Sequence, residues 1–199
     1  WQARGDAEQA ATEAREAASG RIREVDFEDR YGAEAVAVDR AYVEGRKREV
    51  AEKMARLPEN ERQSLEGARK LARVMEVMLF EEGESSNWFG GDAHTALASE
   101  YDDWKNGVDA VVEFEYGDGA KHLALAVDFT LLKHDSWNKI EGIKGEIDSG
   151  KTAQVKYFDS EYEGEKRSLD VAKVVVACDE ATLFSAAALW QKKEKSREA

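Results

Sequence analysis

The 199-residue chain has one cysteine and one proline, and it has no long apolar run. A single cysteine, Cys178, excludes a disulfide framework and a cysteine metal cluster, so we expect a reducing cytoplasm as its compartment. The apolar runs fall short of the roughly 20 residues that a membrane span needs, and no secretory signal is recognisable. We therefore expect no membrane association. Because the chain opens with Trp1 rather than Met, we expect a processed product or a fragment.

Positive charge is scarce: 29 Lys and Arg stand against 42 Asp and Glu, for a net charge of −13. Proteins that grip nucleic-acid phosphates gain affinity from clustered Lys and Arg, so this balance argues against a simple nucleic-acid binder. Nuclease sites need carboxylates in any case, so the charge does not exclude a nuclease. It also leaves open an acidic mimic of DNA.

Residues 1–60 are predicted to be a helical N-terminal extension, rich in Ala, Glu and Arg, that ends near Pro58. Residues 33–57 carry one narrow apolar stripe, which could dock on a partner or on the main domain: Val43, Val50, Met54 and Leu57. The first twenty residues have almost only Ala as apolar residues, and they could be a fraying helix or a binding helix.

Residues 61–199 are predicted to be an α/β domain, with a mixed β-sheet flanked by helices. Its first helix is expected from about Ser64, and the turn signal Gly117-Asp118-Gly119 predicts a hairpin between two clear strands. The expected helices are 64–82, 136–148 and 180–195, and the expected strands are 94–98, 108–116, 122–130, 152–158 and 169–178. The apolar run 174–176 indicates a central strand.

Two aspartates in the hairpin strands are the main candidate for chemistry. Asp128 shares its strand face with Ala124 and Ala126, where a carboxylate is expensive to bury unless something neutralises it. Asp109 lies about as far before the turn as Asp128 lies after it, so an antiparallel pairing brings them together. Two hard carboxylates at a strand end suit Mg²⁺.

Residues 100–114 and 125–130 resemble the PD-(D/E)XK nuclease superfamily, through the segments EYDDWKNGVD and LAVDFT. The resemblance covers roughly residues 64–158 and implies a restriction-endonuclease-like αβββαβ core. It implies that Asp109 and Asp128 bind Mg²⁺ or Mn²⁺, and that a lysine positions the attacking water. The superfamily often adds a glutamate from its first helix, and Glu76 is the candidate for this third ligand.

The sequence departs from the family motif at Thr130, which occupies the lysine position. Some members move that lysine to the following helix, where Lys144 is the best substitute, with Lys133 and Lys139 as alternatives. All three could instead be solvated lysines.

The acidic residues near the motif have alternative roles. Glu76 could be a partly buried acid with a raised pKa, or it could pair with Arg69 or Arg73. Glu100, Asp102 and Asp103 could reach the metal or decorate a loop.

The leading hypothesis is a metal-dependent nuclease that hydrolyses phosphodiester bonds, with DNA rather than RNA as the expected nucleic acid. The alternative is a catalytically inactive protein with the same fold, which binds a protein partner through its N-terminal helices. The sequence does not determine the oligomeric state.

Overall fold

A computed structural model describes residues 21–85, 89–116, 121–132 and 136–197. The first twenty residues, Lys133 and the predicted hairpin turn lie outside these ranges. The described elements are η2 (Glu24–Phe27), α2 (Glu28–Tyr31), α3 (Ala33–Ala55), α4 (Glu59–Ser85), β1 (Ala93–Leu97), η3 (Asp102–Asn106), β2 (Ala110–Tyr116), β3 (Lys121–Leu131), α5 (Ser136–Asp148), β4 (Ala153–Asp159), β5 (Lys166–Cys178) and α6 (Glu180–Arg197). Within the described ranges, no helix combines the length and the apolar character that crossing a bilayer requires.

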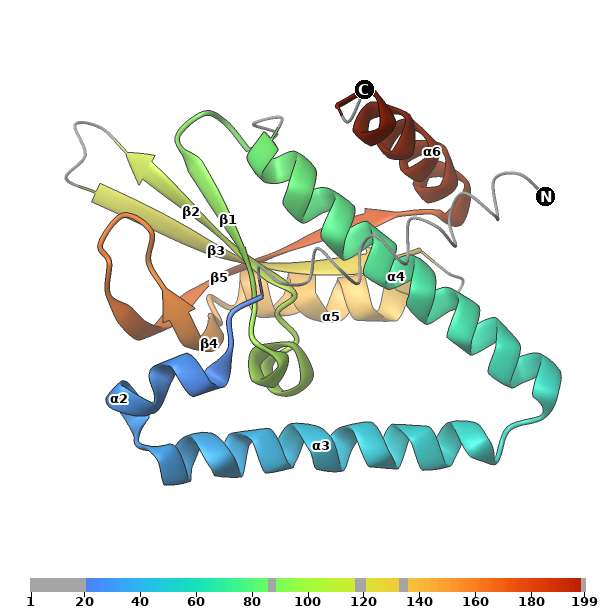
Figure 1. Cartoon of the computed structure of the whole chain (residues 1–199), viewed down its shortest axis with the longest axis horizontal. Coiled ribbons are helices and arrows are strands. Elements are labelled where there is room, and N and C mark those ends of the chain that lie inside the picture. The colour runs from blue at the N-terminus through green and yellow to red at the C-terminus, as the bar shows by residue number, and fades with distance from the viewer. Residues whose placement is uncertain (1–20, 86–88, 117–120, 133–135, 198–199) are drawn as a thin grey trace.

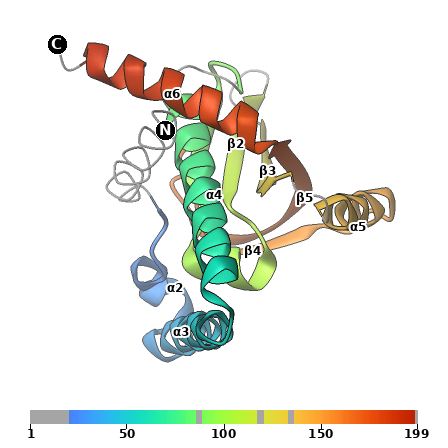
Figure 2. The same ribbon diagram turned by 90° about the vertical axis from the view of Figure 1, so that its right-hand side faces the viewer.

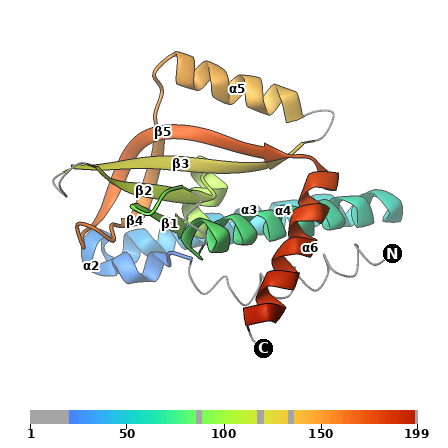
Figure 3. The ribbon, with the colours of Figure 1, turned by 90° about the horizontal axis from the view of Figure 1, so that it is seen from above.

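The predicted α/β class is confirmed. The five strands form one mixed sheet in the order β1-β2-β3-β5-β4, and only the β3–β5 pair is parallel (Figure 1). Helices α4 and α6 cover one face of the sheet, and α5 lies on the other side (Figures 2 and 3).

The strand order adds a detail that the sequence did not indicate. The first strand after α5, β4, lies at the edge of the sheet, and the second, β5, lies between it and β3. The run 174–176 is therefore in an interior strand, as predicted. In the predicted αβββαβ core, the strand after α5 belongs to the core and the last strand is an addition. The observed strand order differs from this arrangement, so the restriction-endonuclease-like core stays a prediction.

Each face of the sheet has its own apolar core. On the α4 side, Val74 and Met78 pack with Val112 of β2, Val127 of β3 and residues of α6. On the other face, Val111 and Ala126 pack with a second set of apolar residues: Ala98, Val108, Ala153, Val155 and Phe158. The apolar spacing of α4 predicts that Leu65 lies on the buried face of this helix. Leu65 is instead 42% exposed, because the first turns of α4 extend past the sheet (Figure 1).

The N-terminal helices are packed onto the α/β domain. Phe27 and Val36 form a third cluster with Tyr157 of β4. Asp39 of α3 accepts a hydrogen bond from the Tyr157 hydroxyl at 2.6 Å and pairs with Lys156. Val43, in the predicted docking stripe, is buried against the chain's own domain. At this position the stripe therefore serves internal packing.

Asp102 fastens η3 to β4. Its carboxylate accepts hydrogen bonds from the backbone N–H groups of Lys156 at 2.7 Å and Tyr157 at 3.0 Å. It also accepts from the Ser99 hydroxyl and from the side-chain amide of Asn106, both at 2.8 Å. Burial raises the pKa of Asp102, and the hydrogen bonds oppose this change. Asp102 is therefore a structural residue rather than a loop decoration.

We expect Asp102→Ala to lower the free energy of unfolding by about 2–4 kcal/mol, because it leaves two buried backbone N–H groups without an acceptor. Urea unfolding followed by circular dichroism measures this change. Asp170→Ala, at an exposed position of β5, is the control and should change stability by less than about 0.5 kcal/mol. Equal effects of the two substitutions would contradict the structural role of Asp102.

Candidate active site

Asp109 and Asp128 lie at the same end of the β2–β3 hairpin. The paired residues of the ladder end with Ala110 and Val127. Beyond that pair the register shifts, because the Asp109 N–H donates to the Val127 carbonyl at 2.9 Å rather than to Asp128. The hairpin nevertheless brings the two aspartates close enough for the charge of Asp128 to raise the pKa of Asp109.

Gly107 directs the chain into β2 at Asp109. It has a left-handed backbone (φ 62°) at the end of the π-helical turn η3, a conformation that favours glycine. The Val108 N–H returns to the Asp102 carbonyl, and the Lys173 ammonium donates to the Gly107 carbonyl at 2.9 Å. Asp109 is thus the first residue to join the sheet.

The Asp109 carboxylate takes the place of a missing strand partner. Because the chain leaves the sheet before Asp109, the Phe129 N–H has no further β2 carbonyl to bind, and the Asp109 Oδ2 accepts it at 2.6 Å. Desolvation, followed by the nearby charges of Glu76 and Asp103, raises the pKa of Asp109 to about 8. The charge of Asp128 contributes in the same direction. The candidate site is therefore a partly buried acidic centre in which Asp109, unlike Asp128, Glu76 and Asp103, makes no ion pair with a described cation.

Glu76 of α4 faces this centre and is also held by arginines. Arg73 donates to its Oε2 at 2.7 Å, and the Arg21 Nη2 is 3.6 Å from the same oxygen. Desolvation raises the pKa of Glu76, and Arg73 opposes the increase. Both interpretations of the sequence thus apply: Glu76 is a partly buried acid with a raised pKa, and it pairs with Arg73. Arg21 was missed, because the Arg-rich segment around it carries no distinguishing signal.

Lys139, rather than Lys144, lies at Asp128. The Lys139 ammonium is 2.7 Å from the Asp128 Oδ1, and the Thr130 hydroxyl donates to the same oxygen at 3.1 Å. Lys144 was the preferred candidate; both lysines are exposed, but among the described residues only Lys139 makes an ion pair with Asp128. Lys139 is near the start of α5, close to where the chain leaves β3, whereas Lys144 is more than one turn further along the helix. Thr130 supports Asp128 from the position of the motif lysine.

The other two acids of the motif segment make ion pairs with cations of the N-terminal region. Asp103 pairs with Arg21 at 3.1 Å, and its charge contributes to the raised pKa of Asp109. Glu100 pairs with Lys47 of α3 at 2.8 Å. Glu100 therefore joins α3 to the domain, and Asp103 belongs to the acidic centre.

The three-ligand set of Asp109, Asp128 and Glu76 stays a prediction. In the ranges given above, no group of three or more His, Cys, Asp or Glu side chains is arranged to hold a metal ion. Mg²⁺, however, is commonly held by one or two carboxylates while it keeps several waters. The partly buried, uncompensated Asp109 beside Asp128 fits this smaller ligand set.

Comparisons with known proteins gave no match: no protein-family model, no curated protein and no solved structure matches the chain. The chemistry of the site therefore follows from its own residues.

The raised pKa of Asp109 predicts a pH-dependent gain in stability for Asp109→Asn. The pKa of Asp109 is about 8 in the folded state and 3.8 in the unfolded chain, so the folded state holds the proton more tightly. Protonation of Asp109 therefore stabilises the fold in full below pH 4, and this stabilisation is lost as the pH rises through 8. Asn keeps an acceptor for the Phe129 N–H and carries no charge. Its advantage over the wild type should grow between pH 4 and 8, to at most about 6 kcal/mol, and then level off.

Thermal unfolding from pH 4 to 9 in the presence of a chelator measures this difference. Asp128→Asn is the control, because Asp128 already has Lys139 as a cationic partner. Parallel stability curves of wild type and Asp109→Asn would contradict the raised pKa.

Proposed function

We propose that the protein is a metal-dependent nuclease that hydrolyses phosphodiester bonds, with DNA as the expected substrate. The observation that supports this proposal is the convergence of Asp109 and Asp128 at one end of the β2–β3 hairpin, where burial and the charges of nearby acids raise the pKa of Asp109 to about 8. A divalent cation is the natural partner of such a centre. The resemblance to the PD-(D/E)XK superfamily is part of the proposal.

The two aspartates would hold Mg²⁺ or Mn²⁺, and Lys139 would act beside them. When bound, the cation would polarise the phosphate and lower the pKa of a bound water molecule. The Lys139 ammonium, 2.7 Å from Asp128, is placed to orient the water and to stabilise negative charge that develops on the phosphate. In the reaction the water oxygen bonds to phosphorus, the bond to one sugar oxygen breaks, and that oxygen leaves with a proton.

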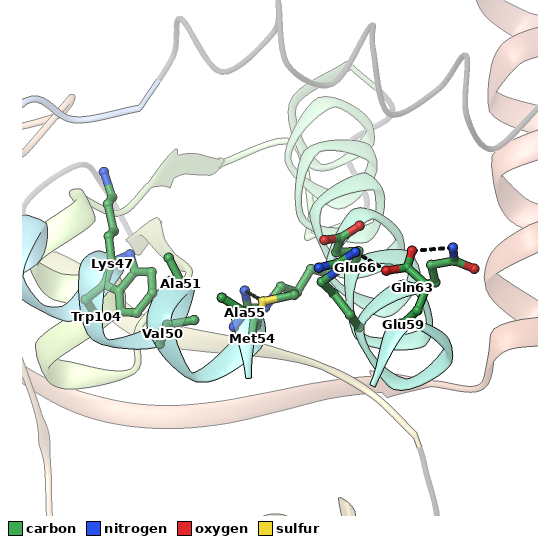
Figure 4. A pocket seen from close by; sticks show the side chains of 11 residues that line it. Lys47, Val50, Ala51, Met54, Ala55, Glu59, Gln63, Glu66 and Trp104 are labelled. Atoms are coloured by element: carbon green, nitrogen blue, oxygen red, sulfur yellow. Dashed lines mark hydrogen bonds and ion pairs between the residues drawn. The ribbon is translucent and has the colours of Figure 1, made fainter. Parts of the chain in front are cut away.

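A second candidate function is a protein-interaction module without catalysis. It is favoured by an open groove between α3 and the first turns of α4, with a volume of about 680 Å³ (Figure 4). Val50 and Met54 of the predicted docking stripe line this groove together with Trp104. Part of the stripe is therefore available to a partner, although Val43 is buried internally.

The nuclease proposal predicts metal-dependent cleavage of plasmid, linear or single-stranded DNA. In Mg²⁺ or Mn²⁺, wild-type protein should cleave at least one of these substrates, and Asp128→Ala should reduce the rate about 100-fold or more, because it removes a metal ligand. Asp148→Ala, at the exposed end of α5, is the matched control and should retain the activity.

Mn²⁺ titration by thermal shift separates loss of chemistry from loss of the site. A ligand that binds only the folded state raises its stability, so Mn²⁺ should raise the Tm of wild type but not that of Asp128→Ala. No cleavage together with no Mn²⁺-dependent shift would end the nuclease proposal and leave the interaction module ahead.

The proposal also distinguishes two lysines of α5. Lys139→Ala should lower kcat by about 100-fold, because it removes a preorganised cation next to Asp128. Lys144→Ala, at an exposed position of the same helix, should leave kcat within about twofold of wild type. Single-turnover cleavage at saturating protein measures both rates. A larger loss in Lys144→Ala than in Lys139→Ala would restore the original assignment of the motif lysine.

A further inference from the structure

Arg21 brings a cation from the N-terminal region to the acidic centre. It forms an isolated parallel bridge with Leu97 of β1, and the N–H of the following residue, Ile22, donates to the Leu97 carbonyl at 3.1 Å. This backbone contact fixes where the Arg21 side chain begins. The side chain is only 11% exposed, so its guanidinium is largely removed from water.

One nitrogen of the Arg21 guanidinium donates a hydrogen bond, and the other two nitrogens do not. Its Nη1 donates to the Asp103 Oδ2 at 3.1 Å. Its Nη2 is 3.6 Å from the Glu76 Oε2, beyond hydrogen-bonding distance, and that oxygen already accepts from Arg73 at 2.7 Å. Neither the Nε nor the Nη2 of Arg21 has a hydrogen-bond partner among the described residues, although both atoms are buried.

Such an arrangement is unusual for an arginine whose role is only structural. A buried donor without a partner costs about 1–3 kcal/mol, and more when it belongs to a charged group. Native structures accordingly leave few such groups, and each calls for an explanation such as a bound ion. A ligand that satisfies both donors would explain why the side chain is held in this position.

The two free donors lie on the same edge of the planar guanidinium. The hydrogen on Nε and one hydrogen on Nη2 point in parallel, away from the Cδ side where Nη1 is bound by Asp103. A pair of parallel N–H groups matches two oxygens of one phosphate or carboxylate. Because Glu76 and Asp103 lie beside Arg21, additional positive charge would strengthen anion binding there, and a divalent cation at Asp109 and Asp128 would supply it.

We propose that the Nε–Nη2 edge of Arg21 binds two oxygens of the substrate phosphate, beside the metal site of the proposed nuclease. This inference rests on the proposed function and adds to it a phosphate-binding residue from outside the α/β domain. A lysine could not replace this arginine, because its ammonium is a point charge without the two parallel donors.

The test uses thymidine 5′-monophosphate as the phosphate probe and the full chain as the protein. Isothermal titration in Mg²⁺ should give measurable binding by wild type, and Arg21→Lys should weaken it about 10- to 100-fold, because one of two charge-assisted hydrogen bonds is lost. Arg23→Lys is the matched control: Arg23 lies two residues further along, is 70% exposed and pairs with Asp26. Its affinity for the nucleotide should equal that of wild type.

A separate titration with Mn²⁺ alone distinguishes this inference from the proposed function. If Mn²⁺ binds and Arg21→Lys binds the nucleotide as tightly as wild type, the phosphate role of Arg21 is wrong and the metal site stands. If Mn²⁺ does not bind but nucleotide binding still depends on Arg21, the inference stands and the metal site is wrong. If wild type does not bind the nucleotide with or without Mg²⁺, the inference fails.

Should Arg21→Lys fail to fold, as judged by circular dichroism, the unmodified protein still provides a test. The Nε–H resonance of Arg21, assigned through its own side-chain correlations, should shift when the nucleotide is added in Mg²⁺. The corresponding resonance of Arg23 should not shift. An unchanged Arg21 resonance at saturating nucleotide would overturn the inference.

Discussion

The hydrogen bond from the Phe129 N–H to the Asp109 carboxylate is the contact around which the candidate site is organised. It exists because Gly107 turns the chain out of the sheet one residue too early for a backbone carbonyl to reach Phe129. A side-chain oxygen therefore takes the place of the missing carbonyl, and this holds a carboxylate at the end of two strands. Asp128 lies at the same end, directly after Val127, the last β3 residue paired with β2.

The charges around this contact are only partly balanced. Asp128 has Lys139, Glu76 has Arg73 and Asp103 has Arg21. Asp109 instead accepts a backbone N–H, and desolvation, together with its acidic neighbours, raises its pKa to about 8. The imbalance is thus concentrated on a single carboxyl group. Groups held in such unfavourable surroundings concentrate at functional sites, where a ligand repays the stability that the apo protein loses.

The sequence predicted what local patterns determine. The strands, the limits of α5 and the position of Asp109 and Asp128 at one end of the hairpin follow from periodicity and from equal spacing about one turn. The position of β5 between β3 and β4 depends on packing between distant segments, which periodicity does not encode. Lys139 was ranked below Lys144 because the angle at which α5 leaves β3 decides which lysine reaches Asp128. Arg21 and Asp102 act through partners that are far away in sequence, so no spacing rule identifies them.

The N-terminal segment bears directly on the choice between the two candidate functions. An extension that served only to bind a protein partner would need an exposed apolar stripe and no contact with the acidic centre. Instead, Phe27 and Val36 pack on Tyr157, and Asp39 bonds to its hydroxyl, so the extension is anchored on β4. Upstream of this anchor, Arg21 reaches Asp103 with two donors still free. Burying a guanidinium beside the carboxylates of Asp103 and Glu76 has a desolvation penalty that docking alone would not require. The extension is therefore better understood as a part of the acidic site than as an independent binding arm.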